Sequence, residues 1–227
     1  MEYIEENKKY IIILGVLVGL LIIFGIVNNI TSKKQYVKTV KSVNNSKLPY
    51  ININDSTVQE LNTRLENQYN EIISLNNDSY MTYEFSKNGN ILSILITKYI
   101  KLDDDYIPEE EYNTYNINLK NNEFLDNDDI FDLYKLDKEE IESKVVTDIM
   151  EQYQYEVDNG YVVGQECDID CYLEEKEYIS VTDNFNVYIK NKKIYGYLNI
   201  KNSSLYYSNE NYPKINKIYN LNDFKIS

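Results

Sequence analysis

Cys167 and Cys171 are the two cysteines of this 227-residue chain, and their spacing allows a local disulfide in an oxidising compartment. The bridge requires a turn between them, because an extended strand would hold their Cα atoms about 13 Å apart and a disulfide needs less than about 7 Å. A disulfide is the favoured prediction, and two free thiols are the alternative. A metal site is the least favoured interpretation, since no third cluster of ligands accompanies this spacing.

Carboxylates are abundant, with 37 acidic residues, but the chain contains no histidine. The absence of histidine excludes Ser-His-Asp and Cys-His mechanisms and the usual histidine-containing zinc sites. Two carboxylates can carry out glycoside hydrolysis, yet no feature of the sequence selects a pair. We therefore predict no catalytic residue, no metal ligand and no cofactor, and we assign no ligand-binding residue.

The acidic run at 126–129 is similar to the start of a calcium-binding loop, but it does not continue as one. An EF-hand needs another oxygen ligand and then a glycine, where this chain has Ile130 and Phe131. We expect a solvated turn there. The other acidic clusters, which we also expect in solvated surface or loop, are 103–105, 109–111, Asp168 and Asp170.

A stretch of eighteen residues without a charge, 10–27, must position everything that follows. As a helix it spans about 27 Å, close to the bilayer's hydrocarbon thickness of about 30 Å. It is longer than the apolar run of a signal peptide, and no small-residue cleavage site follows it. The sequence predicts a single transmembrane helix at 10–27, a short cytoplasmic tail at 1–9 and a linker at 28–48.

The side of the membrane on which the C-terminal part lies does not follow from charge. More lysines follow the span than precede it, which nominally favours a cytoplasmic C-terminal part, but that rule applies to short loops. Gly15 and Gly19 have the spacing at which two membrane helices can approach closely. This pair is weak evidence for association in the membrane, and we assign no oligomeric state.

Past residue 50 the chain holds 34 acidic and 16 basic residues, a net charge of −18. This charge repels nucleic acid and anionic lipid, and a cationic partner is its natural complement. The alternative is that the charge simply keeps the domain soluble.

Apolar periodicity predicts two helices in the domain at 49–227. The first covers Ser56 to Leu75, where Ser56 and Gln59 fit a capping box. The second covers 138–155, after a similar pattern at Asp137 and Glu140.

Strands are predicted around these helices at 80–85, 91–100, 112–119, 181–190 and 194–200, with weaker ones near Leu205 and Ile215. The strand at 91–100 is apolar on both faces and should be central, with an Asn-Gly turn before it. The valines between 36 and 43 leave a short helix or strand open within the linker. The predicted fold class is α+β, with two main helices packed on a largely antiparallel sheet.

Three segments, in this order, carry a family resemblance: NILSILITKYI (90–100), YNTYNINLKNNEFLDNDDIFD (112–132) and FNVYIKNKKIYGYL (185–198). Together with Pro49 and the helix after it, they resemble the extracytoplasmic DUF4163/DUF3298 arrangement. That domain occurs in RsiV-like anti-sigma factors that sense lysozyme and in the N-terminal part of some peptidoglycan deacetylases. The resemblance implies an extracytoplasmic sensing or binding domain. Only nine residues precede the span, and no histidine ligands are present, so neither the anti-sigma segment nor the deacetylase domain is expected.

We therefore expect a single-pass protein of the cell membrane whose C-terminal domain binds a basic, lysozyme-like protein or a cell-wall glycan, and is not an enzyme. One alternative is a small carboxylate-dependent enzyme acting on cell-wall glycan. Another is a structural or assembly subunit of a membrane complex.

Overall fold

The computed structural model describes residues 35–75, 78–101, 109–159, 179–199 and 216–226. The chain divides into two compact units, Met1–Tyr36 and Val37–Ser227, and the fold below is that of the second unit. The predicted membrane helix at 10–27 and the cysteine pair lie outside the described residues. Within the described ranges, no helix is long and apolar enough to cross a membrane.

A two-stranded hairpin opens the second unit. Strand β1 (Val37–Val43) pairs antiparallel with β2 (Ser46–Ile51). This hairpin lies in the segment where the sequence left a short helix or strand open within the predicted linker at 28–48, and the second compact unit begins at Val37. Of the three valines in β1 only the first is buried, which explains why apolar alternation is weak in this segment.

Helix α2 (Ser56–Leu75) has the bounds that the sequence predicts. Its buried side chains recur at the spacing of one helix face: Val58, Leu61, Asn62, Leu65, Tyr69 and Ile72. The predicted cap is wrong by one residue, because Asp55 and not Ser56 accepts the free N–H groups. They come from Thr57 at 2.9 Å and from Val58 at 3.3 Å.

Four antiparallel strands form the largest sheet, in the order β3-β4-β5-β6. Their bounds are Tyr80–Asn88, Ile91–Ile100, Glu109–Asn118 and Glu123–Leu125. The predicted central position of β4 is confirmed, and its first six residues are buried. The Asn-Gly turn also forms where predicted, with Gly89 at φ 60°, a conformation that glycine adopts without a steric penalty.

Helix α3 (Asn127–Tyr134) replaces the solvated turn that we expected at 126–129. Asp126 and Asp129 form a capping box, in which each side chain accepts the backbone N–H of the other residue. The two residues that ruled out a calcium loop, Ile130 and Phe131, are fully buried. The acidic run therefore starts a short helix that is fixed to the core by its apolar face.

Helix α4 (Lys138–Asp158) confirms the second predicted helix. Asp137 caps it and accepts a hydrogen bond from the Glu140 N–H at 3.0 Å. Buried side chains follow at four-residue intervals: Ile141, Val145 and Ile149.

The C-terminal part forms a three-stranded antiparallel sheet in the order β7-β8-β9. Its elements are α6 Val181–Asn184, β7 Phe185–Lys190, β8 Lys193–Asn199, β9 Asn216–Asn220 and the 3-10 helix η1 Leu221–Phe224. The strand predicted at 181–190 is thus corrected to a turn of helix followed by a strand. The helical turn forms because the Ser180 side chain caps it, and Glu142 accepts the Val181 N–H at 2.8 Å. The predicted strand near Leu205 lies outside the described residues.

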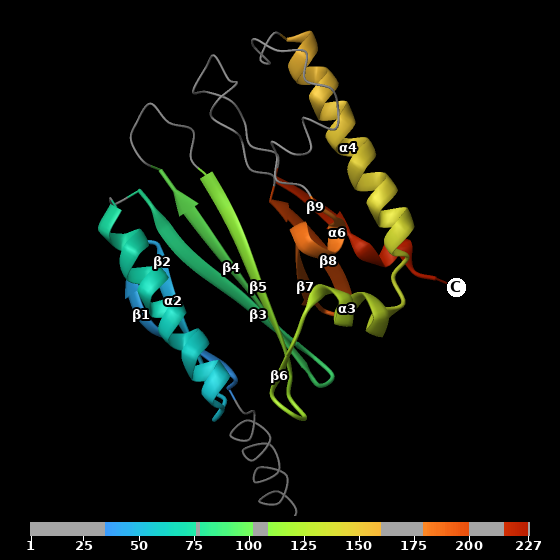
Figure 1. Cartoon of the computed structure of the whole chain (residues 1–227). Coiled ribbons are helices and arrows are strands. Elements are labelled where there is room, and N and C mark those ends of the chain that lie inside the picture. The colour runs from blue at the N-terminus through green and yellow to red at the C-terminus, as the bar shows by residue number, and fades with distance from the viewer. Residues whose placement is uncertain (1–34, 76–77, 102–108, 160–178, 200–215, 227) are drawn as a thin grey trace, which may run out of the picture. The chain divides into compact units, whose positions relative to one another are not determined.

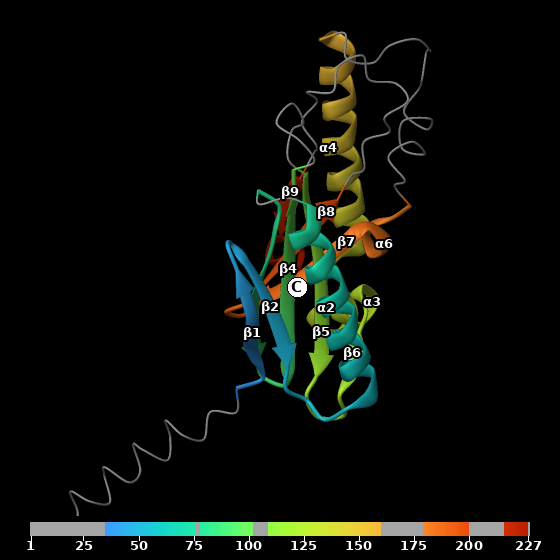
Figure 2. The same ribbon diagram turned by 90° about the vertical axis from the view of Figure 1, so that its left-hand side faces the viewer.

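The predicted α+β class is confirmed, but the single sheet is corrected to three antiparallel sheets in the described part of the chain. The β1-β2 hairpin and α2 lie side by side on one side of the four-stranded sheet (Figures 1 and 2). The three-stranded sheet, α3 and α4 lie on its other side and share one hydrophobic core (Figure 1).

Candidate binding site

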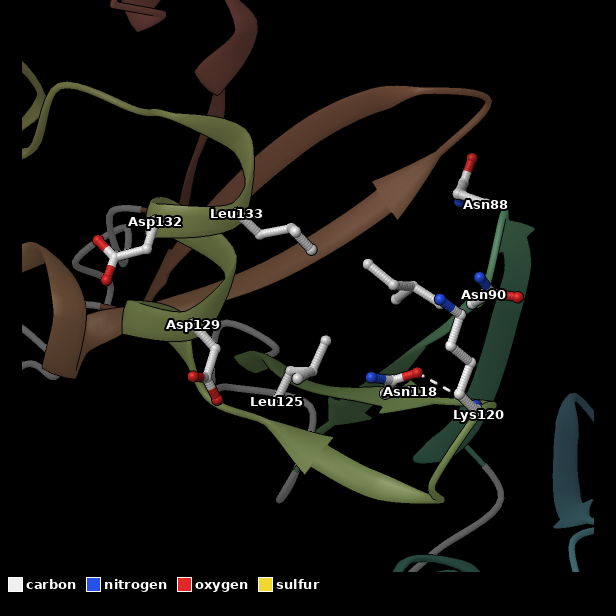
Figure 3. Close-up of a pocket in the computed structure, with 9 residues that line it drawn as sticks. Asn88, Asn90, Asn118, Lys120, Leu125, Asp129, Asp132 and Leu133 are labelled. Atoms are coloured by element: carbon white, nitrogen blue, oxygen red, sulfur yellow. Dashed lines mark hydrogen bonds between the residues drawn. The ribbon is translucent and has the colours of Figure 1, made fainter.

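An open groove lies where the β3-β4 turn, the β5-β6 turn and α3 come together (Figure 3). Its volume is about 640 Å³, and its lining residues are Asn88, Asn90, Ile91, Asn118, Lys120, Leu125, Asp129, Asp132 and Leu133. Tight turns favour asparagine, which explains the amides along one wall. Helix α3 supplies the carboxylates and an exposed leucine on the other.

The floor of the groove is apolar. Leu125 and Leu133 point into the hollow in Figure 3. Leu133 is 59% exposed, so an apolar side chain stands in water at this place. A ligand with an apolar face would cover it and remove that area from water.

Some of the amides are committed to the fold. The Oδ1 atom of Asn88 accepts the Lys192 N–H at 2.9 Å, and Oδ1 of Asn118 accepts the Lys120 N–H at 3.1 Å (dashed line in Figure 3). The side chains of Asn90 and Lys120 have no hydrogen bond or ion pair among the described residues. Both side chains line the groove and can make hydrogen bonds to a ligand there.

The two carboxylates of the groove turn away from the hollow in Figure 3. Asp129 accepts the Asp126 N–H at 3.2 Å, and Asp132 lies 3.7 Å from the Lys138 amine. A hydrogen bond to Asp128 raises the pKa of Lys138, so this amine stays charged beside α3. Both carboxylates are thus used in contacts at the ends of α3.

Asp148 forms a second polar cluster, between α4 and β9, that sequence reasoning missed. Its carboxylate is buried and accepts a hydrogen bond from the Tyr219 hydroxyl at 3.0 Å. Lys144 pairs with it from the previous turn of α4, and the Lys217 amine lies 3.5 Å away. Only the Lys144–Asp148 spacing is visible in the sequence, and it resembles an ordinary surface ion pair.

The charges around Asp148 set its protonation. Burial pushes its pKa upward, but hydrogen bonds from Lys144 and Tyr219 and the charge of Lys217 outweigh burial, and the pKa is lowered. Burial and the neighbouring carboxylate raise the pKa of Tyr219 well above its ordinary value. The cluster is therefore an ionised carboxylate that accepts two hydrogen bonds and lies beside the charge of Lys217, and it ties β9 to α4.

The acidic clusters predicted from the sequence lie in different parts of the chain, and the structure describes only some of them. Residues 109–111, expected in a loop, begin β5, where they pair with the end of β4. Residues 103–105, Asp168, Asp170, Cys167 and Cys171 lie outside the described residues. Within the described ranges, no group of three or more acidic, cysteine or histidine side chains is placed to hold a metal ion.

Comparison with known proteins identifies no family for this chain. No protein-family model matches the chain. No curated protein matches it significantly. The DUF4163/DUF3298 resemblance therefore rests on the three sequence segments and stays a prediction.

Proposed function

We propose that this chain is a membrane-anchored binding module whose folded unit lies outside the cytoplasm and recognises a basic, lysozyme-like protein. The module has no catalytic role in this proposal. The uncharged stretch at 10–27 is the anchor, and the family resemblance supports the extracytoplasmic side.

The observation that carries the proposal is where the acidic charge lies. Among the described side chains, Asp148 is the only carboxylate that is buried. The other described carboxylates are at least partly exposed, so their negative charge lies on the surface of the folded unit. A negatively charged surface speeds the association of a basic protein. This attraction weakens as salt screens the charges.

A cell-wall glycan is the second candidate ligand, and the groove favours it. Asn90 and Lys120 offer hydrogen bonds to hydroxyl or amide groups beside the apolar floor of Leu125 and Leu133. Sites of this kind combine apolar area with a few polar groups that fix orientation.

The test uses the full-length protein in mild detergent. We expect hen egg-white lysozyme to bind in a calorimetric titration at low salt, with an affinity that falls as salt rises. Cytochrome c, an unrelated basic protein, is the control and should bind more weakly. In parallel, insoluble peptidoglycan should retain the protein if the groove takes glycan. Retention of neither lysozyme nor peptidoglycan at low salt would overturn the proposal.

A further inference from the structure

One wall of the groove in Figure 3 carries hydrogen-bond donors, and the fold holds its backbone in place. The β3-β4 turn and the β5-β6 turn build this wall. The Leu119 N–H donates to the Asn90 carbonyl at 2.7 Å and so joins the two turns. The side chains of Asn90, Asn118 and Lys120 line the groove from these joined turns.

The donors on this wall are available to a ligand. The Nδ2 atom of Asn118 points into the hollow in Figure 3 and has no hydrogen bond in the described part of the chain, while its Oδ1 atom accepts the Lys120 N–H. The side chains of Asn90 and Lys120 are exposed and make no hydrogen bond there either. The wall therefore offers two amide groups and one ammonium group.

The facing side of the groove is apolar. Leu125 and Leu133 point into the hollow in Figure 3, and Leu133 is 59% exposed. The carboxylates of Asp129 and Asp132 turn away from the hollow and are used in contacts at the ends of α3. A ligand that fits this arrangement has hydrogen-bond acceptors at one end and an apolar body beside them.

We propose that the groove binds the free carboxylate end of a short peptide with small apolar side chains. The carboxylate accepts hydrogen bonds from the amides, and it accepts a charge-assisted one from the Lys120 ammonium. The apolar side chains cover Leu125 and Leu133 and remove their area from water. This proposal rests on the second candidate ligand of the proposed function, and it names the part of the cell wall that is bound as the peptide end rather than the sugar.

The charge of the molecule favours a ligand with a single negative charge. The net charge of −18 past residue 50 repels a phosphate polymer more strongly than it repels one carboxylate. A neutral sugar ring would gain nothing from the charge of Lys120. A peptide carboxylate uses that charge and brings apolar groups to the opposite side of the groove.

A pair of probes that differ only in this charge tests the proposal. N-acetyl-D-alanyl-D-alanine and its C-terminal amide are titrated into the full-length protein in mild detergent, and binding is followed by NMR. We expect the acid to bind at least about fivefold more tightly than the amide. The L,L isomer of the acid separates the two sources of such a peptide end, the cell wall and a protein. Equal or tighter binding of the L,L isomer would overturn the cell-wall source.

Two lysines provide a matched comparison. Lys120→Gln removes the ammonium group and should reduce the preference for the acid to less than about twofold. Lys47→Gln changes the net charge equally, at an exposed position of β2 that does not line the groove, and should keep the full preference. Equal preferences in these two variants, or equal binding of acid and amide by the wild type, would overturn the carboxylate site.

A second pair of variants tests the apolar side. Leu133→Met keeps an apolar side chain of similar volume and should bind the acid within about twofold of the wild type. Leu133→Asn should bind it at least about threefold more weakly, because the apolar contact is lost. Circular dichroism and thermal melting of each variant show that the fold is retained. Equal binding by Leu133→Met and Leu133→Asn would contradict the proposed orientation of the peptide and overturn the site.

The outcomes separate this inference from the proposed function. If lysozyme or insoluble peptidoglycan binds the wild-type protein and the acid binds no better than the amide, the carboxylate site is wrong and the proposed function stands. If the acid binds with the expected dependence on Lys120 but neither lysozyme nor peptidoglycan is retained, the carboxylate site stands and the proposed function is wrong.

Discussion

Several buried polar side chains of this protein form hydrogen bonds with backbone groups at the edges of strands, where no neighbouring strand pairs with them. Asn62 of α2 accepts the Ile51 N–H at 2.8 Å and donates to the Ile51 carbonyl at 3.0 Å, as a paired strand would. Ser93 accepts the Ile189 N–H at 2.9 Å, and the Asn116 amide donates to the Val187 carbonyl at 2.9 Å. The free edge of β7 is thus satisfied by the face of another sheet, which removes an edge that would otherwise pair with other chains.

Ser93 gives the sharpest test of this arrangement. Ser93→Ala removes one buried oxygen and leaves the Ile189 N–H without an acceptor, so we expect a loss of about 1–3 kcal/mol in the free energy of unfolding. Urea denaturation followed by circular dichroism measures it. Ser74→Ala, at an exposed helix position, is the control and should cost less than about 0.5 kcal/mol. Equal losses for both variants would mean that Ser93 does not hold the edge of β7.

The lowered pKa of Asp148 predicts how the free energy of unfolding changes at acid pH. Its pKa is lowered in the folded state, so its ionised form stabilises the protein above the ordinary aspartate pKa, and this contribution is lost as pH falls through the folded pKa. Asp148→Asn should therefore be about 1–2 kcal/mol less stable than wild type at pH 7. The difference should shrink below pH about 4. Urea denaturation at several pH values measures it, with the exposed Glu151→Gln as control. A difference that does not change with pH would contradict this assignment.

None of these residue roles was predictable from the sequence. Ser93, Asn62 and Asn116 resemble many other serines and asparagines, and what distinguishes them is a backbone partner far away in the chain. The Asp148–Tyr219 contact joins residues 71 positions apart. Local patterns carry no information about such pairs.

At the level of elements, long periodic segments were predictable and short ones were not. The helices α2 and α4, of 20 and 21 residues, were predictable because their apolar side chains recur on one face over several turns. Helices α3 and α6 are only eight and four residues long. Capping side chains, rather than apolar periodicity, determine where they form. At β1 the sequence left a helix and a strand open, since two of its valines face solvent and the alternation is weak.

The corrected cap of α2 can be tested directly. Asp55→Ala removes the acceptor for the Thr57 and Val58 N–H groups and should destabilise the protein by about 1 kcal/mol. Ser56→Ala should have nearly no effect, because this exposed residue is already inside the first turn. Thermal melting of both variants decides between the two caps, and a larger loss for Ser56→Ala would restore the cap that the sequence suggests.

At the level of the whole molecule, the number of sheets and the candidate sites depend on contacts that the sequence does not display. Alternation within each strand predicts antiparallel pairing. It does not predict that β7 begins a separate sheet, because the separation depends on the contacts that the side chains of Ser93 and Asn116 make with the edge of β7. The groove likewise joins two turns and α3, which are predictable only one by one.

The side of the membrane is the prediction on which the proposed partner depends, since a secreted basic protein reaches the folded unit only from outside. In intact cells expressing the full-length chain, a membrane-impermeant phosphine and maleimide should label Cys167 and Cys171 as fully as they do after lysis. A chain with both cysteines changed to serine and with Glu2→Cys is the control, and it should be labelled only after lysis, because the predicted tail is cytoplasmic. Labelling of Cys167 and Cys171 only after lysis would place the acidic surface inside the cell. Its positively charged partner would then have to be cytoplasmic, and the receptor proposal would be wrong even if purified protein binds lysozyme.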